Sequence, residues 1–151
     1  MNDANTPERD GKQVQKGTEN ASSQILDMMD LKGKVTESGA LILRCSDYSP
    51  EDEVYRARHP WSLRNIPIEE MKNAMDRLRE ELSKNGWNIV KDGPDDTVGK
   101  APQIVANSKN GEFSADIRLL DNRKYGDDPS LIEVTVVSKC YKSSPEASPT
   151  P

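Results

Sequence analysis

The stretch PIEEMKNAMDRLREELSKNG, residues 67–86, decides the fold because it holds the most regular pattern in the chain. Its large apolar residues recur at spacings of three and four, which forms one stripe along a helix. These residues are Ile68, Met71, Met75, Leu78 and Leu82. Pro67 suits a first helical turn, and Asn85-Gly86 suits a left-handed helix end. The pattern predicts one long amphipathic helix.

Strand-like segments lie on both sides of this helix. They cover residues 40–45, 54–66, 87–91, 103–107, 112–120 and 131–141. Asn110-Gly111 between two of them is typical of a hairpin turn. A short helix is expected over residues 24–31, with Gly33 as its stop. The sequence therefore predicts an α+β fold: an antiparallel sheet of about five strands, the long helix packed on one face, and a short N-terminal helix.

Residues 54–66 alternate between two kinds of side chain. Tyr55, Trp61 and their neighbours at every second position are large or apolar, while arginines stand between them, which predicts a strand with one polar face. Pro60 cannot donate a hydrogen bond, so we expect an edge position or a bulge. Tyr55, Arg58 and Trp61 form a candidate partner surface, because these residue types dominate interface hot spots. The alternative is that Trp61 packs beneath the helix.

The two ends of the chain differ in composition from its middle. Residues 1–21 contain Val14 as the only large aliphatic side chain after Met1, and residues 143–151 read SSPEASPTP. Such segments bury too little apolar surface to offset the entropy of ordering them. We expect a disordered N-terminal spacer over residues 1–21, a single domain over residues 22–142 and a disordered tail over residues 143–151.

The charge balance disfavours several partners. The chain has 21 basic and 26 acidic residues, a net charge of −5. Nucleic-acid binding usually needs a basic patch, and the one basic cluster, Arg56, Arg58 and Arg64, follows three acidic residues. The sequence shows no transmembrane run and no signal peptide. We expect a monomer without cofactor or metal, attached to a membrane only through an N-terminal lipid anchor, if an upstream leader carries one.

Cys45 and Cys140 each follow a strand-like run, LILR and IEVTVVSK. Metal sites usually cluster Cys and His at short spacing, whereas these two lie far apart in the sequence. If the two strands pair, the sulfurs meet at bridging distance, and the bond would contribute about 4 kcal/mol and indicate export from the cytosol. Two free buried thiols are the alternative.

Several motifs together resemble a group of small actinobacterial secreted proteins and predicted lipoproteins of unknown function. They are Gly86-Trp87-Asn88-Ile89 after the helix, the strand PQIVA at residues 102–106, the hairpin tip NGEF at residues 110–113 and a final strand that ends in Cys140. The resemblance covers residues 41–141. It implies export, a disulfide between the early and last strands, and often a lipidated N-terminal cysteine, which this sequence lacks.

Nothing in the sequence indicates catalysis. His59 is the only histidine, no Gly-x-Ser-x-Gly elbow is present, and a surface or half-buried strand histidine is expected. Asp92, Asp95, Asp96, Asp127 and Asp128 lack the spacing of a calcium loop and suit solvated turns. The sequence favours a non-enzymatic extracytoplasmic domain that binds an unidentified protein or envelope ligand. The alternatives are an inhibitor or immunity-type protein that blocks an enzyme, and an enzyme with an unrecognised site.

Overall fold

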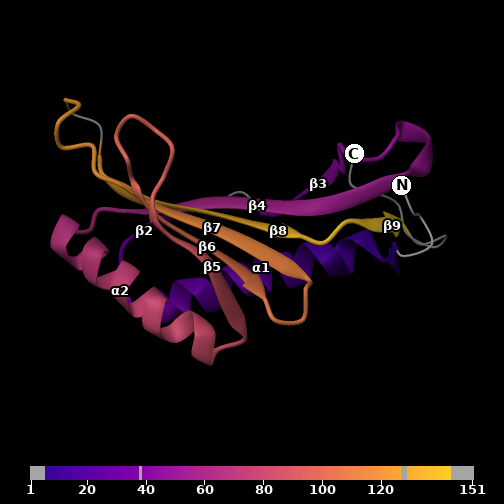
Figure 1. Ribbon diagram of the computed structural model, residues 1–151, viewed down its shortest axis with the longest axis horizontal. Coiled ribbons are helices and arrows are strands. Elements are labelled where there is room, and N and C mark those ends of the chain that lie inside the picture. The colour runs from indigo at the N-terminus through magenta and orange to yellow at the C-terminus, as the bar shows by residue number, and fades with distance from the viewer. Residues whose placement is uncertain (1–5, 38, 127–128, 144–151) are drawn as a thin grey trace.

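The computed structural model describes residues 6–37, 39–126 and 129–143. Within them, two α-helices lie beneath one nine-stranded mixed sheet (Figure 1). The helices are α1 (Gly11–Met29) and α2 (Ile68–Lys84), and a 3-10 turn covers Pro50–Asp52. The strands are β1 (Glu8–Arg9), β2 (Lys34–Glu37), β3 (Leu41–Arg44), β4 (Val54–Arg64), β5 (Trp87–Pro94), β6 (Pro102–Ser108), β7 (Phe113–Leu120), β8 (Leu131–Ser138) and β9 (Tyr141–Ser143).

The expected fold class is wrong. The fold is mostly β, with nine strands instead of about five, and β1 runs parallel to β9, so the sheet is not purely antiparallel. The additional strands β1, β2 and β9 have two to four residues each. A segment that short shows too little alternation to be recognised from its side chains, which is why the sequence did not indicate them.

The strand β4 is the centre of the sheet, so its expected edge position is also wrong. It pairs with β8 and β9 along one edge and with β2 and β3 along the other. Ala57 donates its N–H to Ser138 Oγ on the β8 side, while Val54 accepts from the N–H of Cys45 on the β3 side. Even-numbered residues therefore bond towards β2 and β3. Pro60 lies at a position of β4 that pairs with neither β2 nor β3. The N–H group that proline lacks would have no partner strand there, so the sheet tolerates proline at this position.

The helix α1 begins much earlier than expected. It covers 19 residues from Gly11, so residues 11–21 belong to the fold and are not a spacer. Asp10 caps it, with Oδ1 accepting the N–H of Lys12 at 3.0 Å. The first half of its buried face is built from Gly11, Thr18 and Ala21. Such small side chains carry little hydrophobic signal, which is why the sequence indicated only the last turns.

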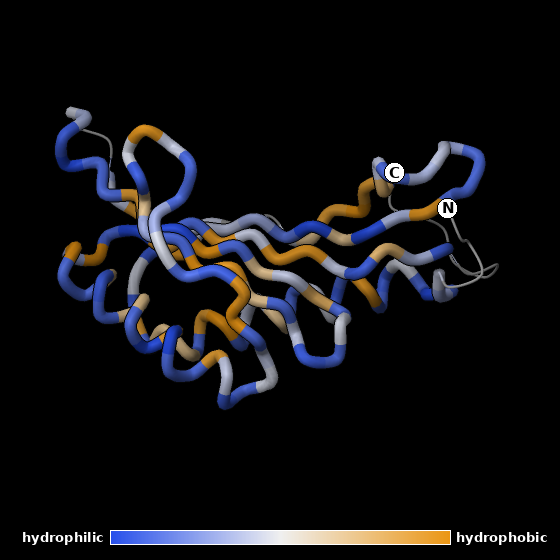
Figure 2. The backbone as a smooth tube through the Cα atoms, viewed as in Figure 1, coloured by the Kyte–Doolittle hydropathy of each residue, from blue (hydrophilic) through white to orange (hydrophobic). Residues whose placement is uncertain are grey.

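The helix α2 confirms the long amphipathic helix that the sequence predicts. Met71, Met75, Leu78 and Leu82 are buried against the sheet, and apolar positions gather where α2 faces the strands (Figure 2). Trp61 belongs to the same core, as the alternative reading of this residue expected. Both helices cover one face, and in the described part of the chain no helix covers the other.

Removing residues 1–21 tests the role of α1. We expect a chain that starts at Ser22 to melt roughly 10 °C or more below the full chain, because it loses more than half of α1 and uncovers the sheet. The measurement is thermal unfolding followed by circular dichroism, with the exposed substitution Lys16→Ala as the matched control on the same helix. An unchanged melting temperature would restore the view that these residues are a spacer.

Candidate functional site

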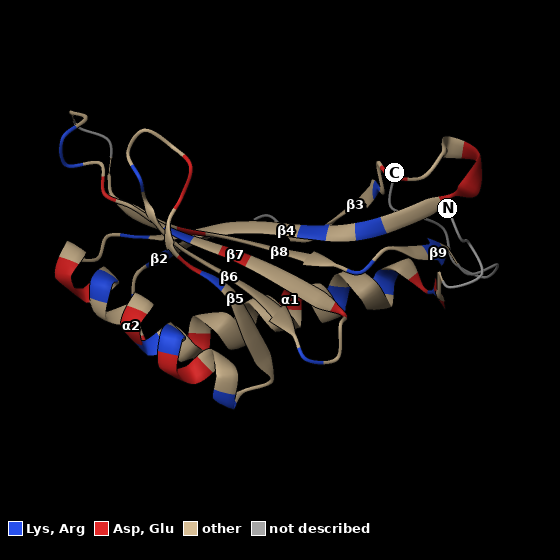
Figure 3. Ribbon diagram, viewed as in Figure 1, with Lys and Arg blue, Asp and Glu red and all other residues tan. Residues whose placement is uncertain are grey.

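The uncovered side of the sheet carries a group of basic and aliphatic side chains. Cross-strand partners share one face of a sheet, and Leu41 lies opposite Arg58, Leu43 opposite Arg56 and Lys34 opposite Arg64. The odd-numbered residues of β4 enter the core, so these even-numbered ones point away from it. We name this group the Arg–Leu face: Lys34, Leu41, Leu43, Arg56, Arg58 and Arg64. Figure 3 shows basic positions along β4.

The cations of the Arg–Leu face form no ion pairs within the described part of the chain. Among the residues that the structure describes, none of its four basic side chains forms an ion pair. Lys34 and Arg64 stand directly opposite each other, an arrangement that destabilises a sheet. A shallow hollow of about 490 Å³ lies over β2, β4 and β8, lined by Arg58, Arg64 and Glu133 among others. The face therefore presents four cations without ion pairs among the described residues, and Glu133 is the acidic side chain in the hollow beside Arg58 and Arg64.

The three residues proposed from the sequence as a partner surface do not share one. Tyr55 and Trp61 are only 8% and 5% exposed and lie on the inner face, whereas Arg58 lies on the outer face. The guanidinium of Arg44 stacks 5.4 Å from the centre of the Tyr55 ring, which covers that ring further. Of the three, only Arg58 belongs to the Arg–Leu face.

Sequence reasoning missed the two leucines of this face. Leu41, Ile42 and Leu43 are all apolar, so the sequence does not indicate whether the two leucines or Ile42 face the core. The register with β4 decides this, because it places both leucines beside arginines. They remain 46% and 40% exposed.

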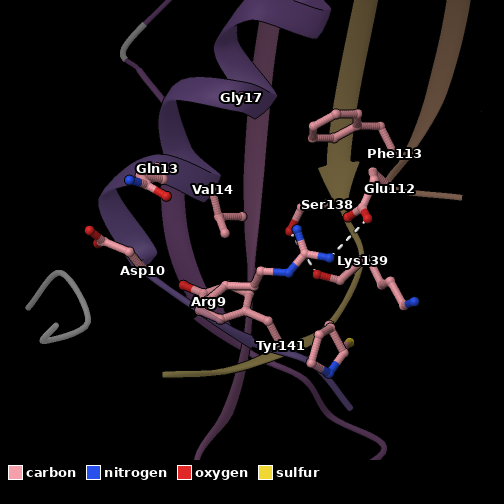
Figure 4. A pocket seen from close by; sticks show the side chains of 12 residues that line it. Arg9, Asp10, Gln13, Val14, Gly17, Glu112, Phe113, Ser138, Lys139 and Tyr141 are labelled. Carbon is pink, nitrogen blue, oxygen red and sulfur yellow. Dashed lines mark hydrogen bonds and ion pairs between the residues drawn. The ribbon is translucent and has the colours of Figure 1, made fainter. Parts of the chain in front are cut away.

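A separate cleft of about 320 Å³ lies where α1, β9 and the start of β7 meet (Figure 4). Arg9 crosses it, and its Nη2 lies 2.9 Å from Glu112 Oε1. Val14 and Phe113 form apolar walls on opposite sides. The lining holds two cations, Arg9 and Lys139, and two acids, Asp10 and Glu112. The cleft has room for a small molecule but no preference for either sign of charge.

Tyr141 at this cleft holds its phenolic proton firmly. Burial raises the pKa of Tyr141 to about 12, with Tyr55 and Asp10 adding to the shift. Its hydroxyl is buried and has no hydrogen-bond partner among the described residues. A proton held this firmly does not transfer near neutral pH. Tyr141 is therefore not suited to act as a general acid or base in this cleft.

His59 lies in the core and not near the surface as expected. It is 1% exposed, and its Nδ1 lies 2.6 Å from the hydroxyl of Ser22 on α1, which is also buried. A Ser–His pair can act on a substrate only if the substrate reaches the hydroxyl. Here α1 and the sheet enclose both side chains, so the pair joins the helix to β4.

The aspartate run after β5 has a structural role. Asp95 is buried, and its Oδ1 accepts hydrogen bonds from Thr97 Oγ1 and from the N–H groups of Thr97 and Ala101. Hydrogen bonds from Thr97 hold the pKa of Asp95 below its ordinary value, although burial opposes the shift. Asp95 thus fixes the loop between β5 and β6 and is not solvated as expected.

Among the other aspartates of this group, Asp96 directly follows Asp95 and is exposed. Asp92 binds Arg79 of α2, while Asp127 and Asp128 lie outside the described residues. Within residues 6–37, 39–126 and 129–143, no three potential ligands gather for a metal ion.

The chain matches no model of a known protein family and no curated protein. Its resemblance to small actinobacterial secreted proteins remains a prediction.

The predicted disulfide between Cys45 and Cys140 is confirmed. The two strands that these cysteines follow do not pair with each other, because β3 and β8 lie on opposite edges of β4. The bond therefore joins the two strands that flank the start of β4, next to the cleft crossed by Arg9. No helix in the described part of the chain is long and apolar enough to cross a membrane.

Breaking this bond should weaken the fold strongly. The bond closes a loop with a sequence separation of 95, for which the chain-entropy model gives about 4 kcal/mol. We expect Cys45→Ala/Cys140→Ala to lower the free energy of unfolding by 2–5 kcal/mol, roughly the range for removing a native disulfide. Urea titration measures this, with the oxidised chain and the same chain in reductant as the comparison. A loss below about 0.5 kcal/mol would show that the pairing of β3 and β9 with β4 suffices.

Proposed function

We propose that this protein is a non-enzymatic extracytoplasmic domain that binds an acidic protein partner through the Arg–Leu face. The observation that carries the proposal is charge segregation. A chain with a net charge of −5 places Lys34, Arg56, Arg58 and Arg64 together on its uncovered sheet face, without ion pairs among the described residues. Complementary charge steers partners and fixes their register, so an acidic surface is the fitting one.

The mixture of side chains favours a protein over a simple polyanion. Leu41 and Leu43 stand directly beside Arg58 and Arg56, which gives aliphatic and guanidinium groups in adjacent positions. Interfaces combine apolar contact with arginine anchors, whereas nucleic acids are held mainly by phosphate contacts. Because successive side chains of an extended segment point to opposite faces, a segment with acidic residues at every second position would present one acidic row to the arginines.

Two observations support a location outside the cytosol. The disulfide is typical of oxidising compartments, and the resemblance described above implies export. An N-terminal lipid anchor remains part of the proposal, contributed by the resemblance alone. The enclosure of His59 and Ser22 supports the non-enzymatic part of the proposal.

A peptide of eight residues that alternates Asp and Val is the probe for this function. We expect it to bind the full, oxidised chain and to bind more weakly as salt rises. Arg56→Glu/Arg58→Glu should weaken binding by at least about tenfold, because each reversal replaces attraction with repulsion. Fluorescence anisotropy of the labelled peptide measures the affinity.

The control, Lys124→Glu/Lys100→Glu, makes the same total charge change in the loops and should leave the affinity unchanged. Equal weakening in both double variants would mean that only net charge matters. Absence of binding to the unmodified chain would contradict the proposal.

A further inference from the structure

The outer edge of β3 has unpaired backbone groups. Cys45 donates its N–H to the C=O of Val54, directly opposite in the register. In an antiparallel pair such bonded positions alternate, so Leu41 and Leu43 also bond towards β4. Ile42 and Arg44 occupy the intervening positions, and their N–H and C=O groups point away from β4. In the described part of the chain, no strand lies beside β3 on that side.

Ala40 is the next residue along this edge whose backbone N–H and C=O point away from β4, and here α1 covers them. Gln15 Nε2 donates to the C=O of Ala40 at 2.9 Å, and Glu19 Oε2 accepts its N–H at 2.8 Å. Two side chains of α1 thus satisfy the backbone at Ala40. Among the described residues, no side chain bonds the backbone groups of Ile42 and Arg44. The cover that α1 provides therefore ends at Ala40.

The opposite edge of the sheet is protected. The register of β5 shifts between Ile89 and Lys91, which marks a bulge, and the strand ends at Gly93 and Pro94. Bulges, lysines and prolines are devices that prevent an edge from recruiting another strand. In β3 no bulge, lysine or proline is present; the strand is four residues long, and its one charged side chain, Arg44, turns back, with Nη1 donating to the C=O of Pro50.

We propose that the acidic partner binds by adding an extended, antiparallel strand to the outer edge of β3. This inference rests on the proposed function and gives its mode of binding. An added strand would lie about 4.8 Å from β3, with alternate side chains beside Leu41 and Leu43. The long side chains of Arg56 and Arg58, one strand further, reach towards acidic groups at those positions. Backbone pairing supplies affinity, and the arginines select acidic sequences.

The test uses two N-methylated forms of the Asp–Val peptide. In the proposed pairing, Asp lies on the outer face, and the Val N–H groups face Ile42 and Arg44. Methylating the Val amides should weaken binding by at least about tenfold, because it removes these bonds. Methylating the Asp amides, which face solvent, should leave the affinity nearly unchanged. The two peptides have equal charge and equal numbers of methyl groups, so they are matched controls.

Amide exchange followed by NMR gives a second readout on the intact chain. Adding the unmodified peptide should slow exchange at Ile42 and Arg44 and leave Leu41 and Leu43 unaffected, since these already bond to β4. Two methylated peptides that bind equally well would overturn strand addition, and so would unchanged exchange at Ile42 and Arg44 during binding. In either case, binding that remains sensitive to Arg56→Glu/Arg58→Glu would leave the proposed function standing. An unmodified peptide that does not bind at all would overturn both.

Discussion

The pairing of β4 along both of its edges is the constraint on which the rest of the structure depends. Its odd-numbered residues bond towards β8, Ala57 through the hydroxyl of Ser138, and place Ala57, His59 and Leu63 in the core. Its even-numbered residues bond to β2 and β3 and direct three arginines to the opposite face. One alternation therefore creates both the hydrophobic core and the proposed partner surface. A shift by one residue would bury the arginines and expose the core, so the register is strongly specified.

The remaining elements stabilise β4 in this position. Below it, α1 contributes buried side chains and the hydrogen bond between Ser22 and His59. At its start, the disulfide joins the strands on its two edges. At the other end of the sheet, α2 packs on β5 and the neighbouring strands through its apolar stripe. Because both helices lie on one side, no helix of the described residues covers the other side of the sheet.

Sequence reasoning recovered the parts of the fold whose signal is local and apolar. The stripe of α2, the alternation along β4 and the disulfide were all predicted, because each is written in the side chains of one segment or in two isolated cysteines. The first half of α1 escaped because Gly11, Thr18 and Ala21 are small or polar. The central place of β4 also escaped, since Pro60 argued for an edge and only the register shows that it falls in a gap. Only Arg58 of the predicted surface lies on the Arg–Leu face, because the alternation of β4 places Tyr55 and Trp61 on the inner face.

Hydrogen exchange along β4 is the most direct test of its central position. If β4 pairs on both edges, the N–H groups of Ala57, Arg58 and Ser62 should all be protected, because odd and even positions each have a partner strand. These amides should rank among the slowest in the chain, close to the limit set by global unfolding. Fast exchange at Arg58 and Ser62 beside slow exchange at Ala57 would identify β4 as an edge strand. That result would contradict the register from which the core and the Arg–Leu face both follow.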